Sequence, residues 1–295
     1  MTVLETNDLC KNYGSIRALD KLNIKVEAGQ IMGLLGPNGS GKTTTLGVIL
    51  SVLGASSGSY EWFGGQYGND HRKHIGSILE TPNFFPYLNA DENLDIIRRT
   101  KGAPKQDFGE LLQLVKLVGR RKSKFHTYSL GMKQRLAIAA TLIGDPQVVI
   151  FDEPTNGLDP EGIAEVRNTL MKVAERGKTV FMASHILAEV EKICSHVTIL
   201  KKGKLLASGP VGSILSNDRM VILSATDNYR LMTLLQSIPE IKSIKEIDGK
   251  LECMADEEVS ISEINKKAVN SGIDINHLEN RKRKLEEEFL EITKS

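Results

Sequence analysis

The glycine-rich stretch Gly36–Thr44 constrains this chain more than any other part of its sequence. It reads GPNGSGKTT and matches the pattern G-x-x-x-x-G-K-[ST] of a phosphate-binding loop. Before it, Ile31–Leu35 is a short, continuously apolar run, which predicts a strand buried on both faces of a sheet. After it, Thr43–Leu53 has apolar residues at helical spacing and is followed by Gly54. The order of strand, glycine loop and helix is the order that a phosphate site requires.

The residue types in this loop suit the binding of a nucleoside triphosphate and its metal ion. Glycines let backbone N–H groups point inward, and the N-terminus of the following helix favours negative charge. Lys42 supplies a mobile positive charge, the Thr43 hydroxyl can coordinate Mg²⁺, and Thr44 adds a backbone donor. The residues expected to bind the nucleoside triphosphate here are Gly36, Pro37, Asn38, Gly39, Ser40, Gly41, Lys42, Thr43 and Thr44.

Two adjacent carboxylates follow a second predicted buried strand, Val148–Phe151. At the end of such a strand Asp152 can hold magnesium, and Glu153 can orient and deprotonate the attacking water. Without the phosphate loop, the same two residues would be interpreted as solvated turn residues. With it, we expect catalysis to depend on Glu153 and Lys42.

The periodicity of the first part of the chain predicts a parallel α/β sheet covered on both sides by helices. Antiparallel strands come first, and a helix-rich insertion covers residues 91 to 142. The predicted elements are strands at Val3–Tyr13, Ile16–Val26, Thr179–Ala183, Val197–Leu200 and Lys204–Ser208, and helices at Pro160–Arg176 and Ile186–Cys194.

A second domain is expected from residue 217 onward, because the phosphate-type motifs stop there and a new alternation begins. We therefore predict domains at 1–216 and 217–295. The second domain is expected to be a small α+β unit with a ferredoxin-like βαββαβ arrangement and a charged helix at its end. The predicted elements are a strand at 220–225, a helix at 229–237, a hairpin over 248–249, a helix at 260–271, a strand at 273–277 and a final helix containing Arg281–Lys284 and Glu286–Glu288.

The order of motifs along residues 1 to about 216 resembles that of ATP-binding-cassette (ABC) ATPases. The motifs are Gly36–Thr44, the segment Tyr128–Arg135 (YSLGMKQR), Asp152-Glu153, Gly157-Leu158-Asp159 and Ser184-His185. The resemblance implies a P-loop fold with a RecA-like parallel core, an antiparallel β subdomain and a helical subdomain. It also implies ATP and Mg²⁺ as cofactors and ATP hydrolysis as the activity.

The same resemblance implies roles for single residues. Tyr13 resembles the aromatic residue that stacks on adenine, and His185 resembles the histidine that senses the γ-phosphate and completes the catalytic set. Ser129 and Gly131 resemble signature residues that contact ATP bound to a partner subunit, and Asp159 would lie at the seam between the two. A homodimer, or a pair with another ABC subunit, is therefore expected to form on ATP binding. Without this context, Tyr13 could be a strand-edge aromatic and His185 a capping or core histidine.

The sequence departs from the family pattern at two places. In the signature LSGGQ, Tyr128 replaces Leu, Leu130 replaces the first Gly and Met132 replaces Gln. If the backbone at this position needs a positive φ, Leu130 would be strained; if it does not, the change from glycine to leucine is mild. Where the family carries a glutamine, Glu80 offers a carboxylate that can bind Mg²⁺. These departures, together with the added C-terminal domain, resemble the ATPases of bacitracin-type and lantibiotic-immunity exporters.

Composition narrows the setting in which this chain works. Its 38 Lys and Arg nearly balance 37 Asp and Glu, which argues against nucleic acid as a partner. No apolar stretch approaches a bilayer-spanning length and the start has no secretory signal, so a cytoplasmic protein is expected. The three separated cysteines predict neither a disulfide framework nor a zinc site.

The expected function is that of an ATP-hydrolysing transporter subunit, peripheral at the cytoplasmic face of the cell membrane. It would drive a separate polytopic permease, with export of a peptide antibiotic, drug or lipid-like compound as the expected direction. Two alternatives stay open: a soluble ABC ATPase that does not act in transport, and a regulatory module that binds nucleotide without hydrolysing it.

Overall fold

The computed structural model describes residues 1–79, 83–214, 219–256 and 259–282, together with residues 285, 287 and 289. It divides into two compact units, Met1–Val211 and Gly212–Ser295. The expected boundary after residue 216 lies outside the described residues.

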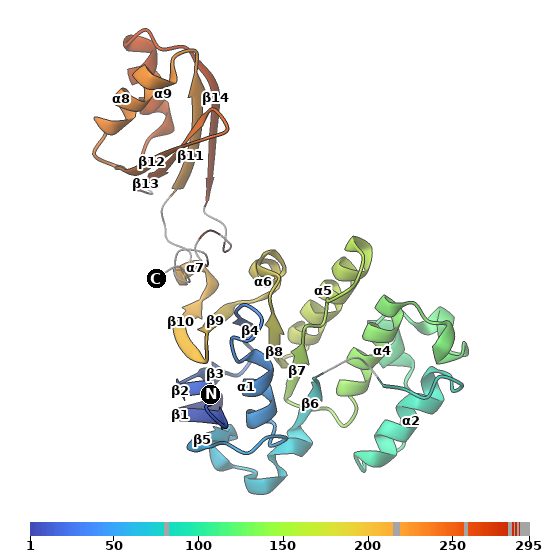
Figure 1. Ribbon diagram of the computed structural model, residues 1–295. Coiled ribbons are helices and arrows are strands. Elements are labelled where there is room, and N and C mark those ends of the chain that lie inside the picture. The colour runs from blue at the N-terminus through green and yellow to red at the C-terminus, as the bar shows by residue number, and fades with distance from the viewer. Residues whose placement is uncertain are drawn as a thin grey trace. The chain divides into compact units, whose positions relative to one another are not determined.

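The first unit is built on a six-stranded sheet whose order is β10-β9-β4-β8-β7-β6 (Figure 1). β10 pairs antiparallel with β9, and the other neighbours pair in parallel. The strands are β4 (Ile31–Leu35), β6 (Ile75–Ile78), β7 (Val148–Asp152), β8 (Thr179–Ser184), β9 (His196–Lys201) and β10 (Lys204–Pro210). All but β6 were predicted from the sequence.

An antiparallel sheet lies beside this core and is formed by the first strands of the chain. β1 pairs with β2, β3 and β5, and the second predicted strand is split into β2 and β3. The strands are β1 (Thr2–Tyr13), β2 (Ile16–Leu22), β3 (Lys25–Glu27) and β5 (Ser57–Trp62). Large apolar residues from both sheets, such as Leu22, Leu34 and Trp62, share one buried core. Burial of this core fixes the first strands against the phosphate loop.

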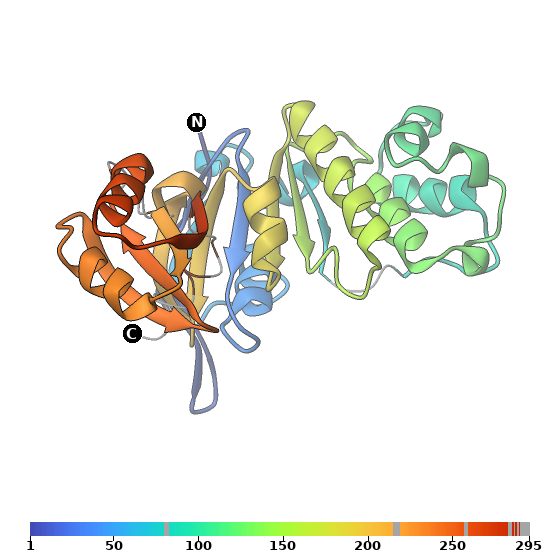
Figure 2. The same cartoon turned by 90° about the horizontal axis from the view of Figure 1, so that it is seen from above.

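Two helices of the first unit, α2 and α4, lie together beside the central sheet. Figures 1 and 2 both show α2 and α4 gathered on the side of β6 that lies away from β1, β2 and β5. The helices are α1 (Lys42–Ile49), α2 (Ala90–Thr100), α3 (Gly109–Leu114), α4 (Leu130–Thr141), α5 (Pro160–Glu175) and α6 (Leu187–Ile193). The short helix α7 (Val211–Ile214) begins at the last residue of the first unit. Short 3₁₀ turns occur at Phe63–Gly65, Gly68–His74, Val118–Arg120 and Phe125–Thr127.

The central sheet brings distant motifs to one edge. β4, β8 and β7 are neighbours and run in parallel, with Leu35 opposite Ser184 and Asp152 opposite Ala183. Because parallel strands end at the same edge, the segments that follow them meet there.

The second unit has a sheet of order β12-β13-β11-β14, all antiparallel, with two helices. Its elements are β11 (Arg219–Ala225), α8 (Asn228–Gln236), β12 (Ile241–Ile247), β13 (Lys250–Ala255), α9 (Ile261–Asn270) and β14 (Ile275–Lys282). The chain order βαββαβ with this strand order is the ferredoxin-like arrangement. The unit has a core of its own that includes Val221, Leu235, Cys253 and Ile264.

The last predicted strand was placed too early and made too short. β14 continues to Lys282, so Arg281 and Lys282 belong to the strand and not to the final helix. Pairing with β11 accounts for this, because Asn280 lies opposite Val221 and Arg281 opposite Met220. Charged residues can continue an edge strand because one side of it faces solvent.

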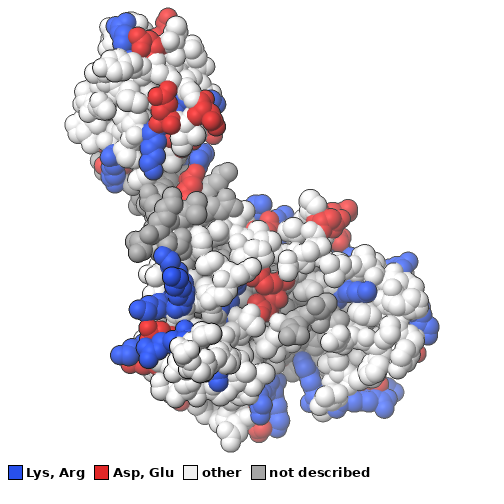
Figure 3. All heavy atoms as spheres, in the orientation of Figure 1, with Lys and Arg blue, Asp and Glu red and all other residues white. Residues whose placement is uncertain are grey.

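The surface agrees with the balanced composition. On the face drawn in Figure 3, basic and acidic side chains are interspersed on both units. Within the residues that the structure describes, no helix is both long and apolar enough to cross a bilayer.

Gly76 on β6 provides a test of how tightly the sheet packs against α4. A Cβ at this position would meet the backbone carbonyl of Thr141 at the end of α4, which cannot move aside as a flexible side chain can. We expect Gly76→Ala to lower the free energy of unfolding by about 1–3 kcal/mol, measured by urea denaturation. Gly54→Ala is the matched control, since nothing lies within 4 Å of its Cβ position. Equal denaturation midpoints for the two variants would contradict this account.

Candidate functional site

The phosphate loop joins β4 to α1, as the sequence predicts. Gly41 caps α1 with a φ of 107° in the left-handed region, and a Cβ there would lie 2.7 Å from the carbonyl oxygen of Ala18. Only glycine meets both conditions without strain. The loop leads directly into the N-terminus of α1, and backbone N–H groups in such a place are suited to bind an anion.

Lys42 is almost fully buried, with 7% of its surface exposed. Its Nζ donates a hydrogen bond to the carbonyl oxygen of Gly36 at 2.8 Å and lies 3.5 Å from Oε1 of Glu153. The ammonium group thus sits between the loop and the carboxylate expected to act as the base. A buried cation next to a phosphate loop can exchange such internal partners for phosphate oxygens.

Besides its contact with Lys42, Glu153 is held at the centre of the site by residues at the end of β8 and directly after it. Its backbone N–H donates to the carbonyl oxygen of Ala183 at 2.9 Å, and its Oε2 lies 2.8 Å from Nδ1 of His185. The backbone N–H of His185 also donates to Oε2, at 3.3 Å. Glu153 has a φ of 49°, a left-handed conformation that is uncommon for a residue with a side chain. The contacts on both sides hold this backbone in place and aim the carboxylate between Lys42 and His185.

Thr43 and Asp152 meet across the site, because the Thr43 hydroxyl donates to Oδ2 of Asp152 at 2.7 Å. A hydroxyl and a carboxylate at this separation are hard oxygen ligands of the kind that Mg²⁺ takes alongside waters and phosphate oxygens. These residues fit such an ion without rearrangement of the strands. Glu80, the third expected metal ligand, lies outside the described residues.

A cavity of about 540 Å³ extends from the phosphate loop to Tyr13. Tyr13 is 46% exposed, and Nζ of Lys11 lies 5.2 Å from the centre of its ring. The residues lining the cavity are Tyr13, Ile16, Arg17, Ala18, Asn38, Gly39, Ser40, Gly41, Lys42, Thr43, Thr44, Glu153 and Lys202. The exposed ring at one end and the loop at the other are suited to a base and a triphosphate.

Four of these lining residues were missed from the sequence: Ile16, Arg17, Ala18 and Lys202. Lys202 reaches the cavity because the β9–β10 turn is bonded to the loop: Gly203 N–H donates to the carbonyl oxygen of Ser40 at 2.9 Å. The Lys202-Gly203 turn itself was foreseen, but no local pattern reveals which loop it contacts.

The signature residues line a second cavity, of about 370 Å³. Its lining includes Ser129, Leu130, Gly131 and Asp159, and among the described residues it shares no member with the first cavity. Ser129 caps α4 by accepting a hydrogen bond from Met132 N–H at 3.3 Å. One chain therefore keeps the signature residues apart from its own phosphate loop.

Leu130 does not strain the signature. It opens α4 with ordinary helical backbone and no positive φ, and its side chain is 43% exposed. Leucine at position 130 therefore allows the same helix start as a glycine would.

Asp159 caps α5, since its Oδ1 accepts a hydrogen bond from Gly162 N–H at 3.1 Å.

Comparison with known proteins identifies the family. The ABC transporter family model matches residues 19–156. The bacitracin transport ATP-binding protein BcrA of Bacillus licheniformis is 37% identical over 99% of this chain and 97% of its own length. The chain belongs to the ABC transporter ATP-binding proteins. It is the ATP-binding, ATP-hydrolysing subunit of a transporter, as the motif order predicted.

Further relatives and solved structures agree. The BcrA protein of Enterococcus faecalis is 35% identical over 98% of this chain and 96% of its own, and the lantibiotic transport ATP-binding protein SrtF of Streptococcus pyogenes is 36% identical over 69% and 89%. A solved ATP-binding subunit of an ABC transporter is 29% identical, with a TM-score of 0.63, covering 72% of this chain and 91% of that one. A dimeric cassette in a post-hydrolysis state with ADP and phosphate is 25% identical, with a TM-score of 0.62, over 70% and 98%. Subunits of this family dimerise and work with membrane permeases.

The place of Lys202 in the cavity wall can be tested directly. We expect Lys202→Gln to weaken ATP binding by about twofold to tenfold, because it removes a cation near the triphosphate while keeping most of the side-chain length. The loss should shrink at high salt, in titrations with a fluorescent ATP analogue.

Lys204→Gln is the control, since Lys204 lies two residues along the same hairpin and its Nζ is 3.6 Å from Oδ2 of Asp20. A loss of affinity as large as that of Lys202→Gln would contradict a specific role for Lys202.

Proposed function

We propose that this subunit powers export of a peptide antibiotic, drug or lipid-like compound through a separate polytopic permease, by dimerising around ATP. The proposal of a dimer is supported mainly by the separation of the two cavities, which share no lining residue among the described residues. Ser129 and Gly131 cannot act on a nucleotide in the cavity of Lys42 unless a second subunit supplies them. Two copies, or this chain with another ABC subunit, would form two such composite sites.

In this proposal the residues of the first cavity bind ATP and prepare the attacking water. The loop N–H groups and Lys42 hold the phosphates, and Tyr13 stacks on the adenine. Thr43 and Asp152 hold Mg²⁺, which neutralises charge on the phosphates when bound. Lys42 gives up its contact with Glu153 when it turns to phosphate, which leaves that carboxylate able to accept a proton from water.

His185 would link the state of the phosphate to the base. Its imidazole and its backbone N–H both contact Glu153, so it lies beside the position where the γ-phosphate would be bound. Asp159 and the signature residues would complete the closure from the other subunit. Opening after hydrolysis would then pass motion to the membrane partner.

The proposal that the transporter is an exporter rests on the similarity of this chain to the bacitracin and lantibiotic transport proteins. For the two bacitracin proteins this similarity extends through the second unit. We place the subunit at the cytoplasmic face of the membrane, bound to its permease, and expect no nucleic acid partner. The family relationship does not favour the soluble alternative. The pairing of Glu153 with His185 supports hydrolysis over a purely regulatory role.

Glu153→Gln tests the catalytic part of this proposal. Glutamine keeps the shape of the side chain but cannot act as a base, so ATP turnover should fall by at least about a hundredfold while ATP still binds. The variant should also accumulate an ATP-bound dimer, measured by size-exclusion chromatography with light scattering. Glu175→Gln, on the exposed end of α5, is the control and should behave like the parent protein. Unchanged turnover in Glu153→Gln would remove Glu153 from the role of base.

Co-expression with a membrane protein encoded beside this subunit tests the transport part. We expect the subunit to purify from membranes together with that protein, to show faster ATP turnover there, and to protect cells against bacitracin. The Glu153→Gln subunit should co-purify equally well but give no protection. Recovery of the subunit only as a free protein that no membrane partner activates would overturn the transport role.

A further inference from the structure

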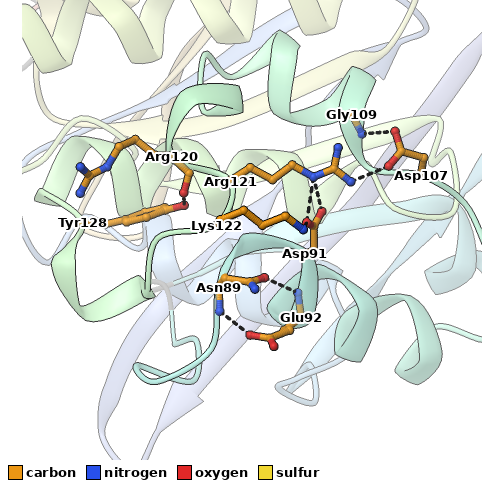
Figure 4. A network of polar contacts seen from close by, with 9 residues as sticks. All are labelled: Asn89, Asp91, Glu92, Asp107, Gly109, Arg120, Arg121, Lys122 and Tyr128. Carbon is orange, nitrogen blue, oxygen red and sulfur yellow. Dashed lines mark hydrogen bonds and ion pairs between the residues drawn. The ribbon is translucent and has the colours of Figure 1, made fainter.

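Tyr128, which stands where the family pattern has leucine, makes a contact that leucine cannot make. Its hydroxyl donates a hydrogen bond to the carbonyl oxygen of Arg120 at 2.7 Å, as Figure 4 shows. The side chain is only 4% exposed, and its ring lies 5.8 Å from that of Phe125. Burial raises the pKa of this phenol, so the hydroxyl remains a donor at neutral pH.

Arg121, the residue after Arg120, is paired with one carboxylate of α2 and with another in the segment before α3. Nε of Arg121 donates to both carboxylate oxygens of Asp91, at 2.7 and 2.8 Å, and Nη2 of Arg121 lies 2.5 Å from Asp107 (Figure 4). Asn89 and Glu92 form a capping box at the start of α2, next to Asp91. The hydrogen bond with Asp91 raises the pKa of Arg121, so its guanidinium stays charged. Arg120 is therefore part of a segment tied to α2.

Backbone hydrogen bonds extend the same connection. Phe125 N–H donates to the carbonyl oxygen of Leu88 at 2.9 Å, and His126 N–H donates to that of Pro86 at 3.0 Å. Ala90 N–H, at the start of α2, donates to the carbonyl oxygen of Arg121 at 3.3 Å. Residues 86–90 and 120–126 thus form one bonded body that ends three residues before Ser129.

From these contacts we propose that Tyr128 is a positioning residue for Ser129. Its hydroxyl fastens the start of α4 to the bonded body formed by residues 86–90 and 120–126, so that Ser129 keeps a fixed place when it closes over ATP in a second subunit. The inference rests on the proposed ATP-driven dimer and adds to it a residue that does not touch the nucleotide. Without the hydroxyl, Ser129 keeps its helix but not its fixed alignment.

Tyr128→Phe removes only this hydrogen bond and keeps the ring. The measurement uses the full chain carrying Glu153→Gln, with ATP-dependent dimerisation followed by analytical ultracentrifugation and ATP affinity of the monomer by fluorescence titration. Because the dimer would contain two such contacts, its dissociation constant should rise by about tenfold. The affinity of the monomer for ATP should change by less than about twofold, since Tyr128 does not line that cavity.

Tyr67→Phe is the matched control. Its hydroxyl accepts a hydrogen bond from Nε2 of Gln147 at 2.8 Å, so the variant also loses one hydrogen bond of a tyrosine hydroxyl, but away from α4. We expect its dimer to match the parent. Tyr128→Leu, which introduces the usual family residue, should weaken the dimer at least as much as Tyr128→Phe.

Failure of the Tyr128 role and failure of the ATP-driven dimer would give different results. If the parent dimerises with ATP and Tyr128→Phe does so equally well, or no worse than Tyr67→Phe, then Tyr128 does not position Ser129. If Tyr128→Phe lowers ATP affinity of the monomer as much as it weakens the dimer, its effect is general and the inference also fails. If the parent does not dimerise with ATP at all, the proposed dimer is wrong and the inference falls with it.

Discussion

The parallel pairing of β4, β8 and β7 is the constraint on which the rest of the first unit depends. Backbone hydrogen bonds set Leu35 opposite Ser184 and Asp152 opposite Ala183, so three segments leave the sheet side by side. Nearly all residues of these strands are buried on one face of the sheet or the other, so a shift of register would break the packing of their side chains against the layers on both faces. The positions of the loop, the acidic pair and the histidine are thus consequences of sheet register.

The chemistry is concentrated at the residue where this regular backbone ends. Glu153 follows β7 directly and adopts a left-handed conformation, which costs of the order of 1–3 kcal/mol for a residue of this kind. Its bonds to Ala183 and His185 come from the neighbouring strand and its continuation, so the sheet that fixes the site also maintains the strain. The signature residues, in contrast, depend on the start of α4 and on the segment before it.

Much of the fold could be predicted because its strands are short apolar runs followed by recognisable motifs. β6 was missed, since its four residues contain a glycine and a serine and carry no motif. β14 was shortened because its last residues are charged, and only pairing with β11 shows that they are extended. In both cases tertiary contacts decide the structure where local sequence is ambiguous.

The candidate site shows the same division. Motif order was enough to select Lys42, Asp152 and Glu153, which the structure brings together. Lys202 could not be found, because its position depends on backbone hydrogen bonds that join Gly203 to Ser40 and Asp20, both far away in sequence. The backbone of Leu130 was also undetermined, since both a helical and a left-handed start were compatible with the signature pattern.

The buried contacts of Lys42 have a consequence for the release of nucleotide. In the single chain its ammonium group already donates to the carbonyl oxygen of Gly36 and lies beside the carboxylate of Glu153. Contact with a phosphate would therefore replace existing bonds with new ones, and such a replacement yields far less free energy than a bond made by a group that had no partner. A subunit whose main phosphate-binding cation keeps internal partners of its own holds the nucleotide less tightly and can release its product, as repeated cycles of hydrolysis require.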